Sequence, residues 1–152
     1  MTTRIVLFLL INFAALGIGG YFTGPGVASD WFQNFNQAPW NPPGWVFGTA
    51  WTFIMICFSF FMASLWGAPE NKTAITSLFV VQWLLNVGWN VVFFHFRSTE
   101  IGLVVISLLT IVVAIFLFAY TKELKAKALL VLPYFIWLLI ATSLNTYIVL
   151  NN

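Results

Sequence analysis

The stretch IGLVVISLLTIVVAIFLFAY, residues 101–120, holds twenty consecutive residues without a charged side chain. An α-helix rises about 1.5 Å per residue, so a helix of this length crosses the roughly 30 Å hydrocarbon core of a bilayer. A charged side chain at the centre of such a helix costs about 2.5 kcal/mol or more. We therefore predict that this segment is a transmembrane helix.

Four further apolar runs resemble it, and they cover residues 4–21, 45–66, 73–96 and 128–150. The six Lys and Arg residues and the four Asp and Glu residues all lie outside these runs or at their ends. The run near the N-terminus lacks a small-residue cleavage site, so we interpret it as a retained span. The sequence predicts one all-α domain over residues 1–152, a polytopic membrane protein built as a five-transmembrane-helix bundle with a long loop at 23–43.

The composition excludes several other classes of protein. Hydrophobic residues make up 61% of the chain, charged residues 7%, and the mean hydropathy is +0.96. A soluble domain is about half apolar and about a quarter charged. A net charge of +2 is too small for a nucleic-acid interface. The single cysteine, Cys57, and the single histidine, His95, form no metal-binding cluster, and we interpret His95 as an interfacial or capping residue.

The basic residues predict an orientation in the membrane. With five spans, one side collects five cations: Arg4, Lys72, Lys122, Lys125 and Lys127. The other side has only Arg97. Because basic residues are enriched in cytoplasmic loops, we predict a cytoplasmic N-terminus and an external loop at 23–43.

Three amides follow the third run at intervals of four residues, namely Gln82, Asn86 and Asn90, so they share one helical face. Trp89 and Phe93 flank them. Amides do not face hydrocarbon without cost, so this stripe is predicted to point into the bundle, towards a partner chain or towards a cavity. Hydrogen bonds between helices and a ligand pocket both explain it.

The fifth run repeats the pattern with Trp137, Ala141 and Asn145 on one face. Pro133, one turn earlier, removes a backbone donor and favours a kink. In the second run, Trp51 lies at membrane depth and is expected to pack inside the bundle. Together these residues predict an inward-facing, aromatic and uncharged cleft for a flat apolar ligand.

Three blocks of sequence then resemble one family. Residues 40–51, WNPPGWVFGTAW, are similar to the W-x-P-P signature and second-helix tryptophan of the TspO/MBR family. Residues 82–90, QWLLNVGWN, resemble its third helix. PYFIW at 133–137 and ATSLN at 141–145 resemble its fifth helix. The family comprises the tryptophan-rich sensory proteins and the translocator protein, or peripheral-type benzodiazepine receptor.

The resemblance implies a homodimer of five-helix bundles in which the first loop partly closes a pocket. That pocket would bind protoporphyrin IX, heme or drug-like aromatic ligands, and no cofactor is required. By position, the resemblance implies the ligand-binding residues Trp31, Trp40, Pro42, Trp51, Asn86, Trp89, Trp137, Ala141 and Leu144. The amide stripes add Gln82 and Asn145. Gly17 and Gly20, with Gly44 and Gly48, allow the close helix approach that a homodimer uses.

The chain departs from the family at three places. Phe32 stands where the family often has tyrosine, and Gln37 and Ala38 replace a basic residue before Pro39. No basic residue follows Tyr147, which argues against cholesterol binding of the animal type.

The leading hypothesis is a membrane-embedded tetrapyrrole-binding protein that acts as sensor, carrier or scavenger, in a bacterial cell membrane. One alternative is a light-dependent porphyrin-degrading enzyme that uses Trp51 and Trp137. Another is a small-molecule transporter, although the spans show no charged core or inverted repeat.

Overall fold

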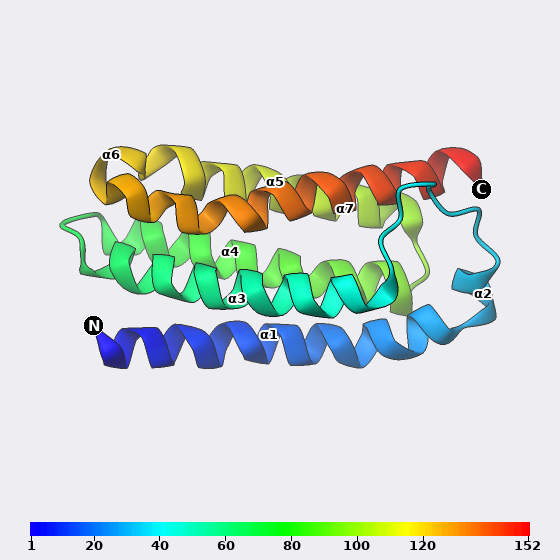
Figure 1. Cartoon of the computed structure of the whole chain (residues 1–152), viewed down its shortest axis with the longest axis horizontal. Helices are drawn as coiled ribbons and strands as arrows, with labels where there is room; N and C mark the ends of the chain where they lie inside the picture. Colours follow the sequence, from blue (N-terminus) through cyan, green and yellow to red (C-terminus); the bar gives the residue numbers. More distant parts are fainter.

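The computed structural model describes residues 1–152, which form helices and short connections without any β-strand. The elements in chain order are α1 (Thr2–Ala28), α2 (Asp30–Gln33), α3 (Gly44–Gly67), α4 (Lys72–Asn90), the π-helical η1 (Val91–His95), α5 (Thr99–Ala119), α6 (Thr121–Leu124), the 3-10 helix η2 (Lys125–Val131) and α7 (Leu132–Asn151). Five helical segments are long and apolar enough to cross a membrane, and the termini lie at opposite ends (Figure 1). The predicted five-helix membrane bundle is confirmed.

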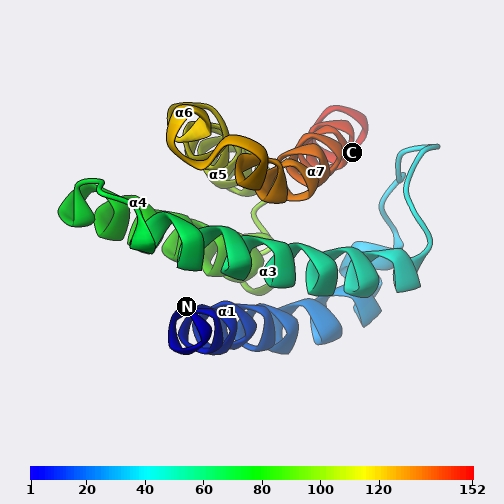
Figure 2. The ribbon, with the colours of Figure 1, turned by 60° about the vertical axis from the view of Figure 1, so that its left-hand side comes forward.

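The long helices form three layers, with α1 on one side, α3 and α4 in the middle, and α5 with α7 on the other side (Figure 2). Close backbone packing joins α1 to α3 and α4, α4 to α5, and α5 to α7. The backbone of α4 does not pack closely against α3 or α7. Side chains therefore have to fill the space between these three helices.

Helix α3 meets the last span mainly at its η2 end. All buried residues of α3 lie from Ile54 onwards, and the first turns from Gly44 to Phe53 contain none. The main core lies beside η2, where the Phe58 ring is 5.4 Å from the rings of Phe116 and Tyr134, measured between centroids. The bundle is thus tightly packed at the η2 end and more loosely packed where α3 begins.

The first helix is longer than the predicted span of residues 4–21. It continues to Ala28 with Pro25 inside it, and α2 follows after Ser29, so the predicted loop at 23–43 is wrong over its first part. Thr23 Oγ1 donates a hydrogen bond of 2.6 Å to Asn90 Oδ1 of α4. Gly26 lies directly against Phe94, where any Cβ atom would collide. These contacts with α4 and η1 offset the loss of the backbone hydrogen bond that Pro25 cannot donate.

The last span also differs from its prediction. A 3-10 helix precedes α7, which covers Leu132–Asn151 instead of residues 128–150. Pro133 lies in the first turn of α7, where its missing N–H would have no helical partner in any case. The predicted kink at Pro133 is therefore wrong, and the break in the regular helix lies in η2.

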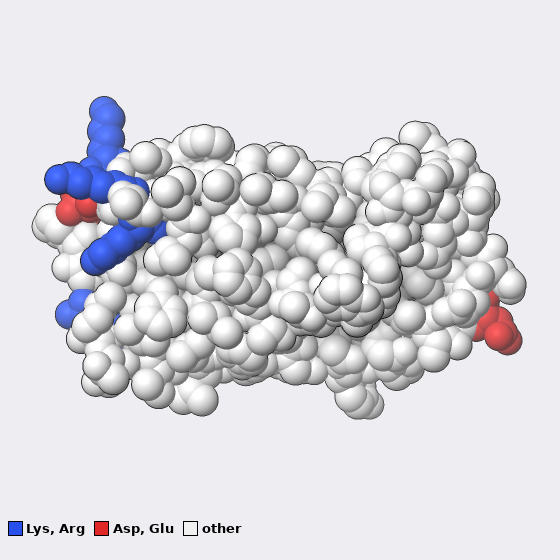
Figure 3. Space-filling view, viewed as in Figure 1, with Lys and Arg blue, Asp and Glu red and all other residues white.

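Charged side chains are confined to the two ends of the bundle, and the surface between them is uncharged in the view of Figure 3. At the end with most of the cations, Lys72 Nζ lies 5.8 Å above the Trp66 ring and donates to the backbone oxygen of Ala68. Arg4 rests against Gly67. Both cations therefore lie at the C-terminus of α3, where the helix dipole favours positive charge.

The glycines that suggested a homodimer face away from the bundle. A Cβ atom added to Gly17, Gly20, Gly44 or Gly48 would meet no atom within 4 Å. These positions take no part in packing within the chain, and the homodimer stays a prediction.

Candidate functional site

The amide stripe of α4 faces the interior, as predicted. Gln82 is 1% exposed and Asn86 is 6% exposed. Gln82 Nε2 donates a hydrogen bond of 2.7 Å to the hydroxyl oxygen of Tyr134 on α7. Asn90 Nδ2 donates to the backbone oxygen of Asn86. Hydrogen bonds to other helices therefore account for two of the amides, since Gln82 donates to Tyr134 and Asn90 also accepts from Thr23 of α1. The side chain of Asn86 makes no hydrogen bond within the chain.

The inner end of the site is formed by Trp51, Tyr134 and Gln82. The Trp51 ring lies 5.8 Å from the Tyr134 ring at 73°, which confirms that Trp51 packs inside the bundle. Gln82 Oε1 is fully buried and has no hydrogen-bond partner. A buried polar atom without a partner costs about 1–3 kcal/mol. This end of the site therefore retains an unused acceptor in an apolar environment.

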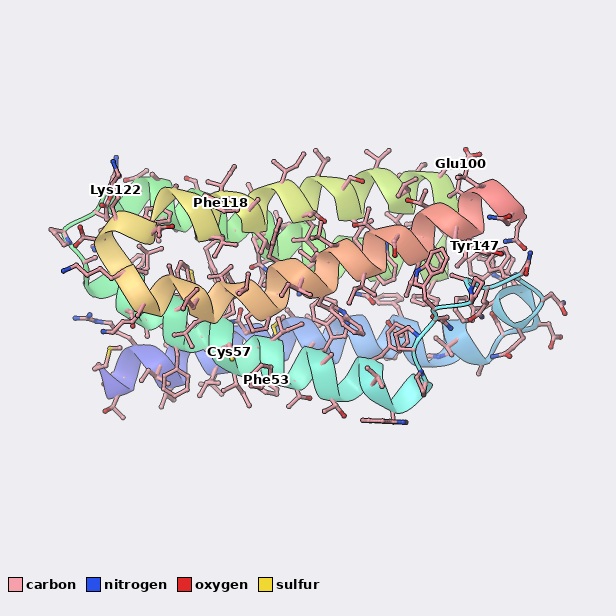
Figure 4. The ribbon with its side chains drawn as sticks, turned by 45° about the horizontal axis from the view of Figure 1, so that its top comes forward. Phe53, Cys57, Glu100, Phe118, Lys122 and Tyr147 are labelled. Carbon is pink, nitrogen blue, oxygen red and sulfur yellow. The ribbon has the colours of Figure 1, made fainter.

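Trp137 lies one turn beyond Tyr134 on α7 and packs against α3. Its ring is 5.3 Å from the Phe47 ring at 84°, and it is 7% exposed. It borders a groove of about 370 Å³ between α3 and α7. The groove is lined by apolar side chains that include Ala50, Phe53, Leu132, Ile136 and Ile140. Figure 4 shows Phe53 and Cys57 along α3.

Towards the other end of the site, Trp89 and Asn145 bind one another. Trp89 Nε1 donates a hydrogen bond of 3.1 Å to Asn145 Oδ1, and Asn145 Nδ2 donates to the backbone oxygen of Thr99 at 2.9 Å. The Trp89 ring also stacks on the Phe93 ring at 5.0 Å and 25°. Both ends of the Asn145 amide are therefore satisfied within the protein.

An aromatic lid, made of Trp31, Phe32 and Phe35 with Phe93 and Phe94 of η1, covers this end of the site. The Trp31 ring lies 5.8 Å from the Phe93 ring, and the Phe32 ring lies 5.6 Å from the Phe94 ring. π-helical turns are rare and often occur at functional sites. Nothing in the apolar run at 73–96 predicted that its last residues form a π-helical turn.

The connection from α2 to α3 is fastened to the end of α7. Trp40 Nε1 donates a hydrogen bond of 3.1 Å to Ser143 Oγ, and the Trp40 ring lies 5.5 Å from the Tyr147 ring. The backbone N–H of Asn36 donates to Asn152 Oδ1 at 2.8 Å. Figure 4 shows Tyr147 beside this connection. Trp40 itself is 54% exposed.

A second groove, of about 620 Å³, lies between α5 and α7 and is bordered by Trp40, Thr110, Thr142 and Thr146. Neither groove includes Asn86, Trp89 or Ala141. Of the α3, α4 and α7 side chains predicted to line the inward cleft, Trp137 alone borders one of these two grooves.

The predicted ligand-binding residues fall into two groups. Those that lie on α3, α4 and α7 are Trp51, Gln82, Asn86, Trp89, Trp137, Ala141, Leu144 and Asn145, whose side chains are buried or half-buried. We call this group the aromatic cluster. Trp31 belongs to the lid, and Trp40 and Pro42 lie in the connection above α7. Phe47 and Tyr134 join the aromatic cluster through ring contacts, although neither was among the predicted site residues.

Known proteins match this chain over most of its length. The TspO/MBR family pattern matches residues 6–150. "Tryptophan-rich protein TspO" of Chlorobaculum tepidum is 33% identical over 141 residues, which cover 91% of this chain and 89% of that protein. A protein of the same name from Archaeoglobus fulgidus is 32% identical over 153 residues, which cover 100% and 96%. The human "Translocator protein" is 28% identical over 119 residues, which cover 76% and 70%. The chain is thus a multi-pass integral membrane protein and belongs to the TspO/MBR family.

Proposed function

We propose that the protein binds a tetrapyrrole of the protoporphyrin IX type in the aromatic cluster and acts as a sensor, carrier or scavenger of this ligand. The observation that carries the proposal is the region between α3, α4 and α7. It contains no charged residue, and side chains rather than close backbone packing connect α4 to the other two helices across it. α3 reaches α7 through the ring contacts of Phe47 and Trp51. α4 reaches α7 through the hydrogen bonds of Gln82 and Trp89. A flat macrocycle that replaces these contacts gains aromatic stacking and dispersion on several faces.

The ligand would enter between α3 and α7. α3 packs more closely against η2 than against α7, and the turns of α3 from Gly44 to Phe53 contain no buried residue. The groove that Trp137 borders already opens between them. Binding then requires the Trp137 and Phe47 rings to move apart, while the packed core beside η2 stays in place.

The Trp51→Phe/Trp137→Phe variant should bind protoporphyrin IX about tenfold more weakly, because two indole rings are replaced by smaller phenyl rings. The stacking area falls, while both side chains stay apolar. The affinity is measured by titrating the purified protein into the porphyrin in the dark and following the porphyrin absorption band. This readout does not depend on the tryptophans that are removed.

Trp45→Phe is the matched control, since Trp45 lies on the same helix and is 72% exposed. Its affinity should equal that of the parent protein. An unchanged affinity in the double variant would show that the ligand does not bind in the aromatic cluster.

We also infer that the N-terminus is cytoplasmic, because the end that holds Arg4 and Lys72 also carries the lysines around α6. A cysteine introduced at Asn34, in the connection after α2, should react with a membrane-impermeant maleimide in intact cells. A cysteine at Thr2 should react only after permeabilisation. The reverse pattern would contradict this orientation.

A further inference from the structure

The charged side chains nearest to the candidate site lie at the lid end of the bundle. This end carries Asp30, Arg97 and Glu100, while the other cations gather around α6 and the N-terminus of α1. Figure 4 labels Glu100 at the lid end of the bundle and Lys122 at the opposite end. Arg97 is therefore the only cation available to an acidic group that binds near the lid.

Arg97 has an unusual backbone conformation that follows directly from η1. Its φ is 54°, in the left-handed region that residues with a side chain rarely adopt. Two hydrogen bonds close the π-helical turn around it, from the N–H of Phe96 to the oxygen of Val91 and from the N–H of Ser98 to the oxygen of Val92. Strain of this kind persists only where the surrounding structure enforces it.

This conformation places the guanidinium on the lid. Its Cζ atom lies 5.8 Å from the centroid of the Trp31 ring. No ion pair holds it, although Asp30 precedes Trp31 directly in the sequence. The Arg97 side chain lies over the Trp31 ring and makes no hydrogen bond within the chain, so its N–H groups are free. The edge of a guanidinium matches a carboxylate with two parallel hydrogen bonds.

A continuous series of contacts leads from Arg97 into the aromatic cluster. Below the guanidinium, Trp31 lies 5.8 Å from Phe93, and Phe93 lies 5.0 Å from Trp89, between ring centroids. Trp89 is in turn hydrogen-bonded to Asn145. Arg97 thus lies at the rim of the same space in which we place the ligand.

The inner end of the space, beside Gln82, lacks the positive charge that Arg97 supplies at the rim. Gln82 Oε1 is an unpartnered acceptor, and no charged residue lies on the stretches of α3, α4 and α7 that form the cluster. A carboxylate buried there would face another acceptor without a compensating cation, which is strongly unfavourable. Acidic groups of a ligand therefore have a cationic partner at the rim and no cation at the inner end.

We propose that Arg97 is a specificity-determining residue that binds a carboxylate of the ligand, so that planar aromatic acids bind with their acidic edge at the lid and their apolar edge towards Gln82. The inference rests on the proposed function for the position of the ligand. It adds the residue that recognises the acidic groups of the ligand and the direction in which the ligand lies.

The test compares two ligands with the same macrocycle, protoporphyrin IX with its two carboxylates and its uncharged dimethyl ester, by the same absorption titration. Arg97→Gln should weaken the binding of the diacid about tenfold, because a charge-assisted pair is lost, and should leave the affinity for the ester within about twofold. Arg97→Lys keeps the charge but not the paired geometry, so it should lie between the parent and Arg97→Gln.

Lys127→Gln is the matched control, since it removes the same charge at the opposite end and should change neither affinity. A loss that is equal for diacid and ester would mean that Arg97 only supports the lid, and it would overturn the inference. Equal diacid affinity in Arg97→Gln and the parent would also overturn it. If the parent binds neither ligand, the proposed function itself fails, which separates the two failures.

Discussion

Phe58→Ala is expected to lower the free energy of unfolding by about 3 kcal/mol, at the low end of the roughly 3–5 kcal/mol that such changes cost in soluble cores. Phe58 is 0% exposed and contacts rings of α3, α4, α5 and α7. In a bilayer the lipid is as apolar as the core, so the transfer contribution largely vanishes. What remains is the loss of dispersion contacts around an unfilled cavity.

The measurement is reversible unfolding in mixed micelles of increasing denaturing detergent, followed by circular dichroism. Phe53→Ala provides the control, since Phe53 lies on the same helix and is 56% exposed to lipid. This change should cost less than about 0.5 kcal/mol. Similar losses for both variants would mean that the core beside η2 is not the principal packed unit of the bundle.

The position of this core bears on how the site could open. Phe58 fixes α3 against the other helices in its second half, whereas the first half of α3 holds Phe47 and Trp51 of the aromatic cluster without a buried residue. A ligand that separates Phe47 from Trp137 therefore disturbs few of the contacts that hold the bundle together. Regions of low local packing are the ones that move at small cost in free energy.

The spans were predictable because the cost of burying a charge confines Arg97, Lys122 and similar residues to the ends of helices. The inward direction of Gln82 and Asn86 was predictable for the same reason, applied to amides. The extension of α1 through Pro25 was not. Gly24 and Pro25 usually mark a loop, and only the contacts of Thr23 with Asn90 and of Gly26 with Phe94, which are remote in sequence, show why the helix continues.

The partners of the polar side chains were also beyond prediction. Asn12 Nδ2 donates to Ser59 Oγ at 2.9 Å between α1 and α3, and Trp89 bonds to Asn145. Each residue by itself signals only that a partner must exist, because helix periodicity fixes the face of one helix and not its neighbour. The pairing depends on how the five helices are arranged.

Tyr134→Phe is expected to cost about 1–2 kcal/mol, because it leaves the Gln82 amide buried with neither end bonded. The hydroxyl of Tyr134 receives the 2.7 Å hydrogen bond from Gln82 Nε2, while Gln82 Oε1 already lacks a partner. Adding Gln82→Leu should recover most of that loss, since the double variant then buries no unpaired polar group. The same unfolding measurement in a double-mutant cycle gives the coupling between the two residues.

Strictly additive costs in this cycle would show that Gln82 and Tyr134 do not interact, and would remove the polar inner end of the site. With coupling confirmed, the Gln82→Leu/Tyr134→Phe variant becomes informative about function. It should approach the parent in stability and still bind protoporphyrin IX, because the proposed partner of the acidic groups, Arg97, and the stacking faces of Trp51 and Trp137 are intact. A fully apolar pair at this position would thus keep both the fold and the binding of the ligand, so the hydrogen bond between Gln82 and Tyr134 would be needed for neither.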